Sequence, residues 1–162
     1  MSHALNHLQN HPAQSDTPCV LCCDTAPTAE HTIARADAYR IVWAQEANYP
    51  CWVRLVWNSH IAELSELSPA ESAVVWHALM CIERGMRTVL SPDKINVASF
   101  GNRVPHVHWH IIPRWIDDAH WPEPSWGATL NPTALSHGLE KRPALALEIQ
   151  RLLKQSLTQS LS

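Results

Sequence analysis

The sequence has few of the features that mark membrane, secreted or disordered proteins. No apolar run approaches the roughly 20 residues that a membrane-spanning helix needs. The first residues show no basic start followed by an apolar stretch, so we expect no signal peptide. Only 17% of residues are charged and 46% are hydrophobic, which is typical of a folded globular chain. A length of 162 residues favours one domain.

The chain also lacks a block of basic charge and an even set of cysteines. Lys and Arg number 12 against 15 Asp and Glu, which argues against binding to a nucleic-acid polymer. Five cysteines without an export signal favour a reducing compartment, so we expect a cytoplasmic protein with free thiols or a metal. What the chain has in excess is histidine, with 11 residues, and tryptophan, with 8.

Composition and periodicity divide the chain into three parts. Residues 1–17 are polar, carry three histidines at intervals of four, and are expected to form a flexible tail. Residues 18–138 hold the motifs described below and are expected to form the domain. Residues 139–162 begin with Arg142-Pro143 and carry apolar residues along one side, which predicts a C-terminal helical extension.

The predicted elements indicate an α+β fold. A capping box of Ser68, Pro69 and Glu71 begins a long helix with one apolar stripe, which ends at Ser91-Pro92. Runs rich in β-branched and aromatic residues predict four strands, at 39–43, 52–57, 94–98 and 106–112. The Pro- and Trp-rich stretch 113–138 is expected to wrap over a surface rather than add a strand.

The most informative segment is the last of these strands, where histidines alternate with apolar residues. Side chains on a strand alternate between faces, so His106, His108 and His110 are expected to line one face. Three buried imidazoles would each need a polar partner, so these histidines indicate a functional site rather than part of the hydrophobic core. Two chemistries fit: one imidazole attacks phosphorus while its neighbours bind phosphate, or the three together bind a catalytic zinc ion.

Cysteine spacing indicates a second candidate site. Cys19-Val-Leu-Cys22 has the spacing of half a tetrahedral zinc site, and the alternatives are two buried thiols or a redox pair. The adjacent Cys23 is a competing ligand. Cys51 and Cys81 lie in apolar segments and are expected to be ordinary buried residues.

The run His106-Val-His-Trp-His-Ile-Ile112 closely resembles the signature of the histidine triad (HIT) family. The order of the surrounding segments is similar to that family over about residues 19–126. The resemblance implies a five-stranded antiparallel sheet with a long and a shorter helix, to which this chain adds its C-terminal helix. It also implies a homodimer that acts as a nucleotide hydrolase or nucleotidyl transferase.

The resemblance assigns roles to individual residues. His108 would attack the α-phosphorus of a nucleotide phosphoramidate, ester or dinucleoside polyphosphate and form a nucleotidyl-histidine intermediate. His110 would contact the phosphate oxygens, and Asn96 matches a phosphate-contacting asparagine. The rival interpretations are a metal-dependent hydrolase with a catalytic zinc on the histidine strand, and a non-catalytic nucleotide-binding module.

Upstream of the motif the chain departs from the family. Many members have Gly-Gln-Ser/Thr-Val where this chain has Gly101-Asn-Arg-Val104. We expect Asn102 and Arg103 to bind phosphate, and Ser99 to supply the missing hydroxyl.

Two further segments are candidates for binding the nucleoside. The acidic residue that usually grips the ribose aligns with Ala44, with Glu46 close by. Trp121 and Trp126 either anchor a loop or form a wall for base stacking.

Zinc-bearing relatives of the family suggest the remaining metal ligands. By that resemblance, His60 and His106 would join Cys19 and Cys22 in a structural zinc site. Such a site would leave His108 and His110 for chemistry, which itself needs no cofactor.

Overall fold

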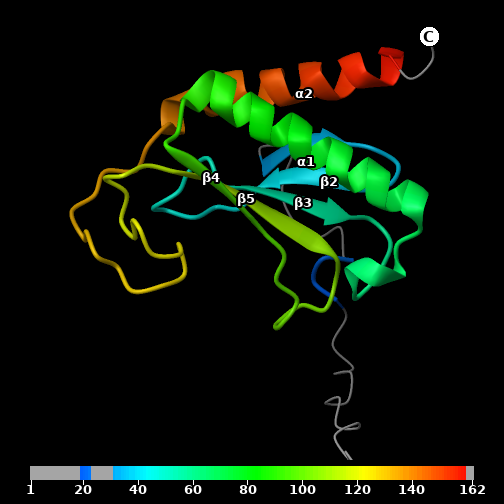
Figure 1. Cartoon of the computed structure of the whole chain (residues 1–162), viewed down its shortest axis with the longest axis horizontal. Helices are drawn as coiled ribbons and strands as arrows, with labels where there is room; N and C mark the ends of the chain where they lie inside the picture. The colour runs from blue at the N-terminus through cyan, green and yellow to red at the C-terminus, as the bar shows by residue number, and fades with distance from the viewer. Residues whose placement is uncertain (1–18, 23–30, 160–162) are drawn as a thin grey trace, which may run out of the picture.

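The computed structural model describes residues 19–22 and 31–159, with side chains through residue 155. Its strands form one antiparallel sheet in the order β1-β2-β3-β5-β4, and two α-helices lie against it (Figure 1). This confirms the predicted α+β fold with a five-stranded antiparallel sheet. The predicted tail over residues 1–17 and the thiol of Cys23 lie outside the described residues.

The strands are short, and three differ from the expectation, β3 by only one residue at its start. They span β1 Thr32–Arg35, β2 Tyr39–Trp43, β3 Val53–Trp57, β4 Lys94–Ala98 and β5 His108–Arg114. The prediction missed β1, which has four residues and pairs with β2 across a register irregularity. It also began β5 two residues too early, because the amide of His106 bonds to the carbonyl of Val104 in a turn.

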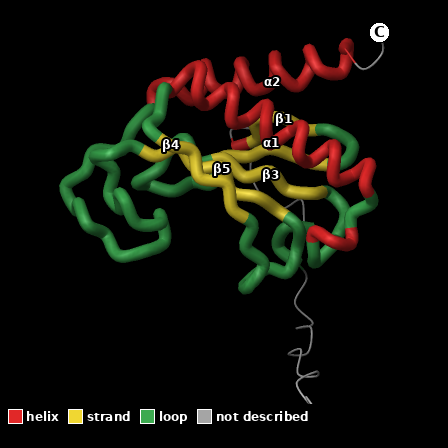
Figure 2. Tube along the Cα trace, viewed as in Figure 1, coloured by secondary structure: helices red, strands yellow, loops and turns green. Residues whose placement is uncertain are grey.

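Both helices lie on the same side of the sheet (Figure 2). Helix α1 (Pro69–Leu90) begins at the predicted capping box, where the Ser68 hydroxyl and the Glu71 carboxylate each accept the other's backbone N–H. Helix α2 spans Arg142–Gln159. The described residues hold no other α-helix, only two short 3-10 segments. Neither helix combines the length and apolar character needed to cross a membrane.

The core lies between the helices and one face of the sheet. As predicted, α1 contributes an apolar stripe at helical spacing, which includes Val75, Leu79, Ile82 and Met86. Helix α2 adds Leu145 and Ile149, both 0% exposed, and burial of each contributes about 1.5–3 kcal/mol. The helices approach closely at Gly85, where a Cβ would lie 3.0 Å from Cγ1 of Ile149. The opposite face of the sheet carries the histidines.

A buried ion pair holds the irregular loop of residues 115–138 against the sheet. Arg114 Nε lies 2.6 Å from one Asp118 carboxylate oxygen, and its Nη2 lies 3.0 Å from the other. Both side chains are at most 3% exposed. Asp118 also accepts three backbone N–H groups of the loop and the hydroxyl of Tyr49. One carboxylate therefore fixes the start of the loop against the sheet. The prediction that the irregular stretch begins at residue 113 was wrong for Pro113 and Arg114, which end strand β5.

Replacing Asp118 by Asn is expected to lower the free energy of unfolding by about 3–5 kcal/mol, because Arg114 then becomes an uncompensated buried charge. Burial alone raises the pKa of Asp118, but hydrogen bonds from Arg114 and the His120 amide outweigh it and lower the pKa to about 2. The stabilisation by the carboxylate is thus present above about pH 4 and is lost as the pH falls through about 2. Urea unfolding of the wild type and the variant measures both effects.

Asp117→Asn is the matched control, because this neighbouring carboxylate is 72% exposed. We expect it to change stability by less than about 1 kcal/mol. Equal destabilisation by the two variants would contradict the role of Asp118.

Candidate functional site

Strand β5 places His108 and His110 together on the sheet face opposite the helices. Trp109 and Ile111, which alternate with them, point into the core. Both imidazoles are 7% exposed, and their ring centroids lie 5.0 Å apart. The predicted alternation is therefore present for these two histidines, and it produces a pair of adjacent imidazoles.

A backbone hydrogen bond orients the ring of His108. Its Nδ1 lies 2.6 Å from the carbonyl oxygen of His106. A carbonyl only accepts, so Nδ1 carries the proton and Nε2 keeps its lone pair. Burial lowers the pKa of His108 more than the hydrogen bond to the His106 carbonyl raises it, and the positive charge of Arg54 lowers it further, which favours the neutral ring. The Ser99 hydroxyl donates to the carbonyl of His108 at 2.8 Å, so its proton is used within the protein.

His110 is held in the opposite tautomer. The indole N–H of Trp52 donates to Nδ1 of His110 at 3.1 Å. Nδ1 is then the acceptor, and the ring proton lies on Nε2. Burial, followed by the charge of Arg54, lowers the pKa of His110 to about 3. At neutral pH the pair therefore consists of one imidazole with a free Nε2 lone pair and one with an Nε2–H donor.

The other residues predicted to bind the nucleotide have different positions. Asn96 on β4 pairs with Ile112 of β5, and its Oδ1 accepts from Arg114 at 3.0 Å, which leaves its amide N–H groups as donors. Asn102 and Arg103 are exposed in the loop between β4 and β5. The structure thus places Asn96 on the sheet beside β5 and leaves Asn102 and Arg103 on a surface loop.

Aromatic side chains border the histidine pair on the β4 side. The ring of Phe100 lies 5.4 Å from that of His110, and Trp126 meets Phe100 edge-on at 4.6 Å. Trp126 is 56% exposed and Phe100 36%. Trp126 therefore reaches the neighbourhood of the site, and Phe100 is a neighbour that the sequence patterns did not single out.

The position that the resemblance aligns with a ribose-binding acidic residue holds no carboxylate. Ala44 is 7% exposed and packs with Trp52 and Ile112. The carboxylate of Glu46 lies 3.6 Å from the guanidinium of Arg54. Glu46, the acidic residue close to this position, is thus paired with the positive charge of Arg54.

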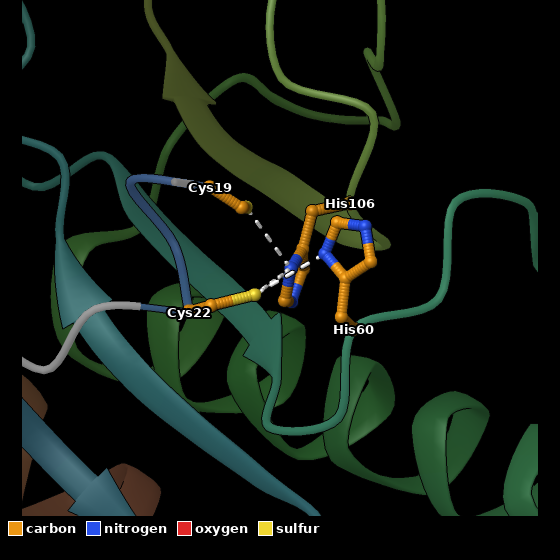
Figure 3. Close-up of side chains that lie close together, drawn as sticks. All are labelled: Cys19, Cys22, His60 and His106. Carbon is orange, nitrogen blue, oxygen red and sulfur yellow. Dashed lines mark hydrogen bonds between the residues drawn. The ribbon is translucent and has the colours of Figure 1, made fainter. Parts of the chain in front are cut away.

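The four predicted metal ligands converge, as Figure 3 shows. The Sγ atoms of Cys19 and Cys22 and the Nδ1 atoms of His60 and His106 all lie within 4.8 Å of one another. The three closest sulfur–nitrogen separations are 3.2, 3.4 and 3.5 Å. Ligand bonds of normal length around a tetrahedral zinc ion would separate sulfur and nitrogen by about 3.5 Å. The donor set and its spacing therefore fit such a metal.

Neighbouring groups support this cluster. Nε2 of His106 lies 2.7 Å from the carbonyl of Trp57, so it donates there and leaves Nδ1 available to a metal. Arg40, on β2, donates to the carbonyl of Leu21 between the two cysteines at 2.5 Å. His106 therefore faces the cysteines, and His108 and His110 do not join it in the metal cluster found among the described residues. This geometry does not favour a catalytic zinc on all three histidines.

A family model for the HIT domain matches residues 26–115. A crystal structure of a histidine triad protein from Bradyrhizobium japonicum is 30% identical, with a TM-score of 0.61 over 75% of this chain and 90% of that one. The chain belongs to the histidine triad family. A histidine triad protein from Marinobacter aquaeolei is 29% identical, with a TM-score of 0.61 over 77% of this chain and 89% of that one.

A more distant HIT structure shares the fold alone. It is a zinc-bound histidine triad family protein from Mycobacterium smegmatis, 18% identical, with a TM-score of 0.58 over 85% of this chain and 94% of that one. A comparison with curated proteins found no match.

Two further residues of this HIT chain contact the candidate sites and were not singled out by the sequence patterns. Trp52 sets the tautomer of a residue 58 positions away, and Arg40 binds a carbonyl 19 positions away. Arg40 lies in β2 and Trp52 directly precedes β3. In such apolar segments, no local pattern shows whether a tryptophan or an arginine serves packing or function. Only the pairing of the strands brings them to the site.

Replacing Trp52 by Phe is expected to remove the hydrogen bond that fixes the tautomer of His110, because the variant retains an aromatic ring but loses the N–H donor. Nitrogen NMR of labelled histidines should show His110 protonated at Nε2 in the wild type and a mixture of tautomers in the variant. Trp43→Phe is the control, since Trp43 packs in the core on the opposite face. A pure Nε2–H tautomer in Trp52→Phe would contradict the assignment.

Proposed function

We propose that this HIT protein is a nucleotide hydrolase or nucleotidyl transferase that forms a covalent intermediate on His108. The observation that carries the proposal is the pair of opposite tautomers. Nε2 of His108 has a lone pair for attack, and Nε2–H of His110 lies on the neighbouring ring as a donor to a phosphate oxygen. Membership of the family supports the nucleotide as the substrate class.

The proposed reaction has two displacements at the α-phosphorus. Nε2 of His108 forms a bond to phosphorus as the bond to the amine, alcohol or phosphate leaving group breaks. That group departs with the electron pair of the bond, and an amine or alcohol takes up a proton from solvent as it leaves. Water or another acceptor then attacks phosphorus and releases its proton to solvent, and the bond to His108 breaks with its electron pair returning to Nε2. The proton on Nδ1 of His108 stays hydrogen-bonded to the carbonyl of His106, which stabilises the positive charge that the ring carries in the intermediate.

Mass spectrometry of protein quenched during turnover of an adenosine phosphoramidate or a dinucleoside polyphosphate tests this proposal. We expect a nucleotidyl adduct on His108. His108→Ala is expected to lose at least about 10³-fold in turnover while it keeps its fold and nucleotide binding. Comparable turnover in His108→Ala would contradict the mechanism, and nucleotide affinity without turnover or adduct in the wild type would favour a binding module.

The same proposal assigns a structural zinc ion to Cys19, Cys22, His60 and His106. The fit of the donor set supports it, as does the hydrogen bond that frees Nδ1 of His106. The ion would tie the Cys19–Cys22 turn to the ends of β3 and β5 and so stabilise the strand that holds His108.

Elemental analysis of protein purified without added metal should find about one zinc ion per chain. Cys22→Ser removes a ligand and is expected to lower the zinc content severalfold. Cys81→Ser is the control, because Cys81 is buried on α1 outside the cluster. A wild-type preparation with only a trace of zinc, or a Cys22→Ser variant with full content, would contradict the assignment.

The homodimer stays a prediction. In the described sheet β4 has a strand neighbour on one side only, and Val97 on it is 44% exposed. Helix α1 exposes Trp76 and Met80 one turn apart. These surfaces are compatible with a second copy as partner.

A further inference from the structure

Arg54 lies directly beside the histidine pair. In the sheet it is paired with His110 of β5 on one side and with Val42 of β2 on the other. Directly opposed residues of neighbouring strands have side chains on the same face, with Cβ atoms about 4.5–5.5 Å apart. Arg54 therefore borders His110 on the β3 side, across from Phe100 on the β4 side.

The guanidinium of Arg54 makes only weak interactions with the described part of the protein. Glu46 is 3.6 Å away, and the two side chains are 33% and 46% exposed, so this pair contributes at most about 1 kcal/mol. Nε of Arg54 is buried and has no hydrogen-bond partner among the described residues. A buried N–H donor without an acceptor is unfavourable, and an anion bound at this face would satisfy it.

Two other arginines of this face, Arg114 and Arg40, already donate to protein acceptors. Arg114 donates to Asp118, Asn96 and the backbone of Glu123. Arg40 donates to the carbonyl of Leu21 in the cysteine turn.

The neighbouring His110 does not supply this charge. Burial, with a further contribution from Arg54, lowers the pKa of His110 to about 3, so the ring is neutral at pH 7. A phosphate transferred between two groups retains negative charge on its non-bridging oxygens, and cations next to these oxygens are the usual means of stabilising it. Arg54 is placed to be that cation.

We propose that Arg54 is a phosphate-binding residue that holds a non-bridging oxygen of the α-phosphate beside His110, with Glu46 as its partner until the phosphate arrives. This inference rests on the proposed function. Bidentate contact with phosphate oxygens would use Nε and a terminal nitrogen together, which is a geometry that suits guanidinium and not ammonium.

The test compares a nucleoside monophosphate with its own nucleoside, so that the phosphate is the only difference. The probes are adenosine 5′-monophosphate with adenosine and guanosine 5′-monophosphate with guanosine, titrated calorimetrically into the full chain. We expect the wild type to bind the better monophosphate about 10- to 100-fold more tightly than its nucleoside. Arg54→Gln should reduce this ratio to within about threefold of one and leave nucleoside affinity unchanged, whereas Arg54→Lys should retain an intermediate ratio.

Arg87→Gln is the matched control, because it makes the same change of charge on α1 at a side chain that is 71% exposed. It should keep the wild-type ratio. A purely structural role for Arg54 would lower nucleoside affinity and the urea midpoint together instead of the ratio. A ratio in Arg54→Gln within about twofold of the wild type, or no preference for the monophosphate in the wild type, would overturn the proposal.

The outcome is separable from that of the proposed function. A His108 adduct together with an unchanged ratio in Arg54→Gln would reject Arg54 alone. An Arg54-dependent ratio without any His108 adduct would retain the phosphate site and reject the covalent mechanism.

Discussion

Each imidazole of the triad has one ring nitrogen committed to the protein, and that commitment decides what the other nitrogen can do. The carbonyl of Trp57 takes the proton of His106 and leaves a nitrogen facing two thiols. The carbonyl of His106 does the same for His108, and the indole of Trp52 enforces the reverse arrangement in His110. Three chemically identical side chains thereby present three different groups: a nitrogen that faces two thiols, a free Nε2 lone pair and an Nε2–H donor.

The features that the sequence predicted well depend on local chemistry. The start of α1 follows from a capping box within four residues, and the site histidines follow from alternation along one strand. The convergence of Cys19, Cys22, His60 and His106 spans distant segments, and it was predicted only because the chain resembles a family in which those segments meet.

The missed features depend on pairing across the sheet. Nothing near Trp52 or Arg54 in the sequence indicates that both border His110, because that contact exists only once β3 and β5 are in register. Strand β1 was missed for a related reason. It has only four residues, of which Ala34 has a low strand preference, and its pairing with β2 rather than its composition holds it in the sheet.

The close approach of α2 to α1 at Gly85 has a consequence for what counts as the folding unit. The HIT family match ends at residue 115, yet Leu145 and Ile149 fill the surface of α1 around that glycine. A chain shortened to residues 26–115 would keep His106, His108 and His110, but it would expose an apolar surface along helix α1. We expect such a fragment to aggregate, so the segment that the family model matches is smaller than the segment that can fold unaided.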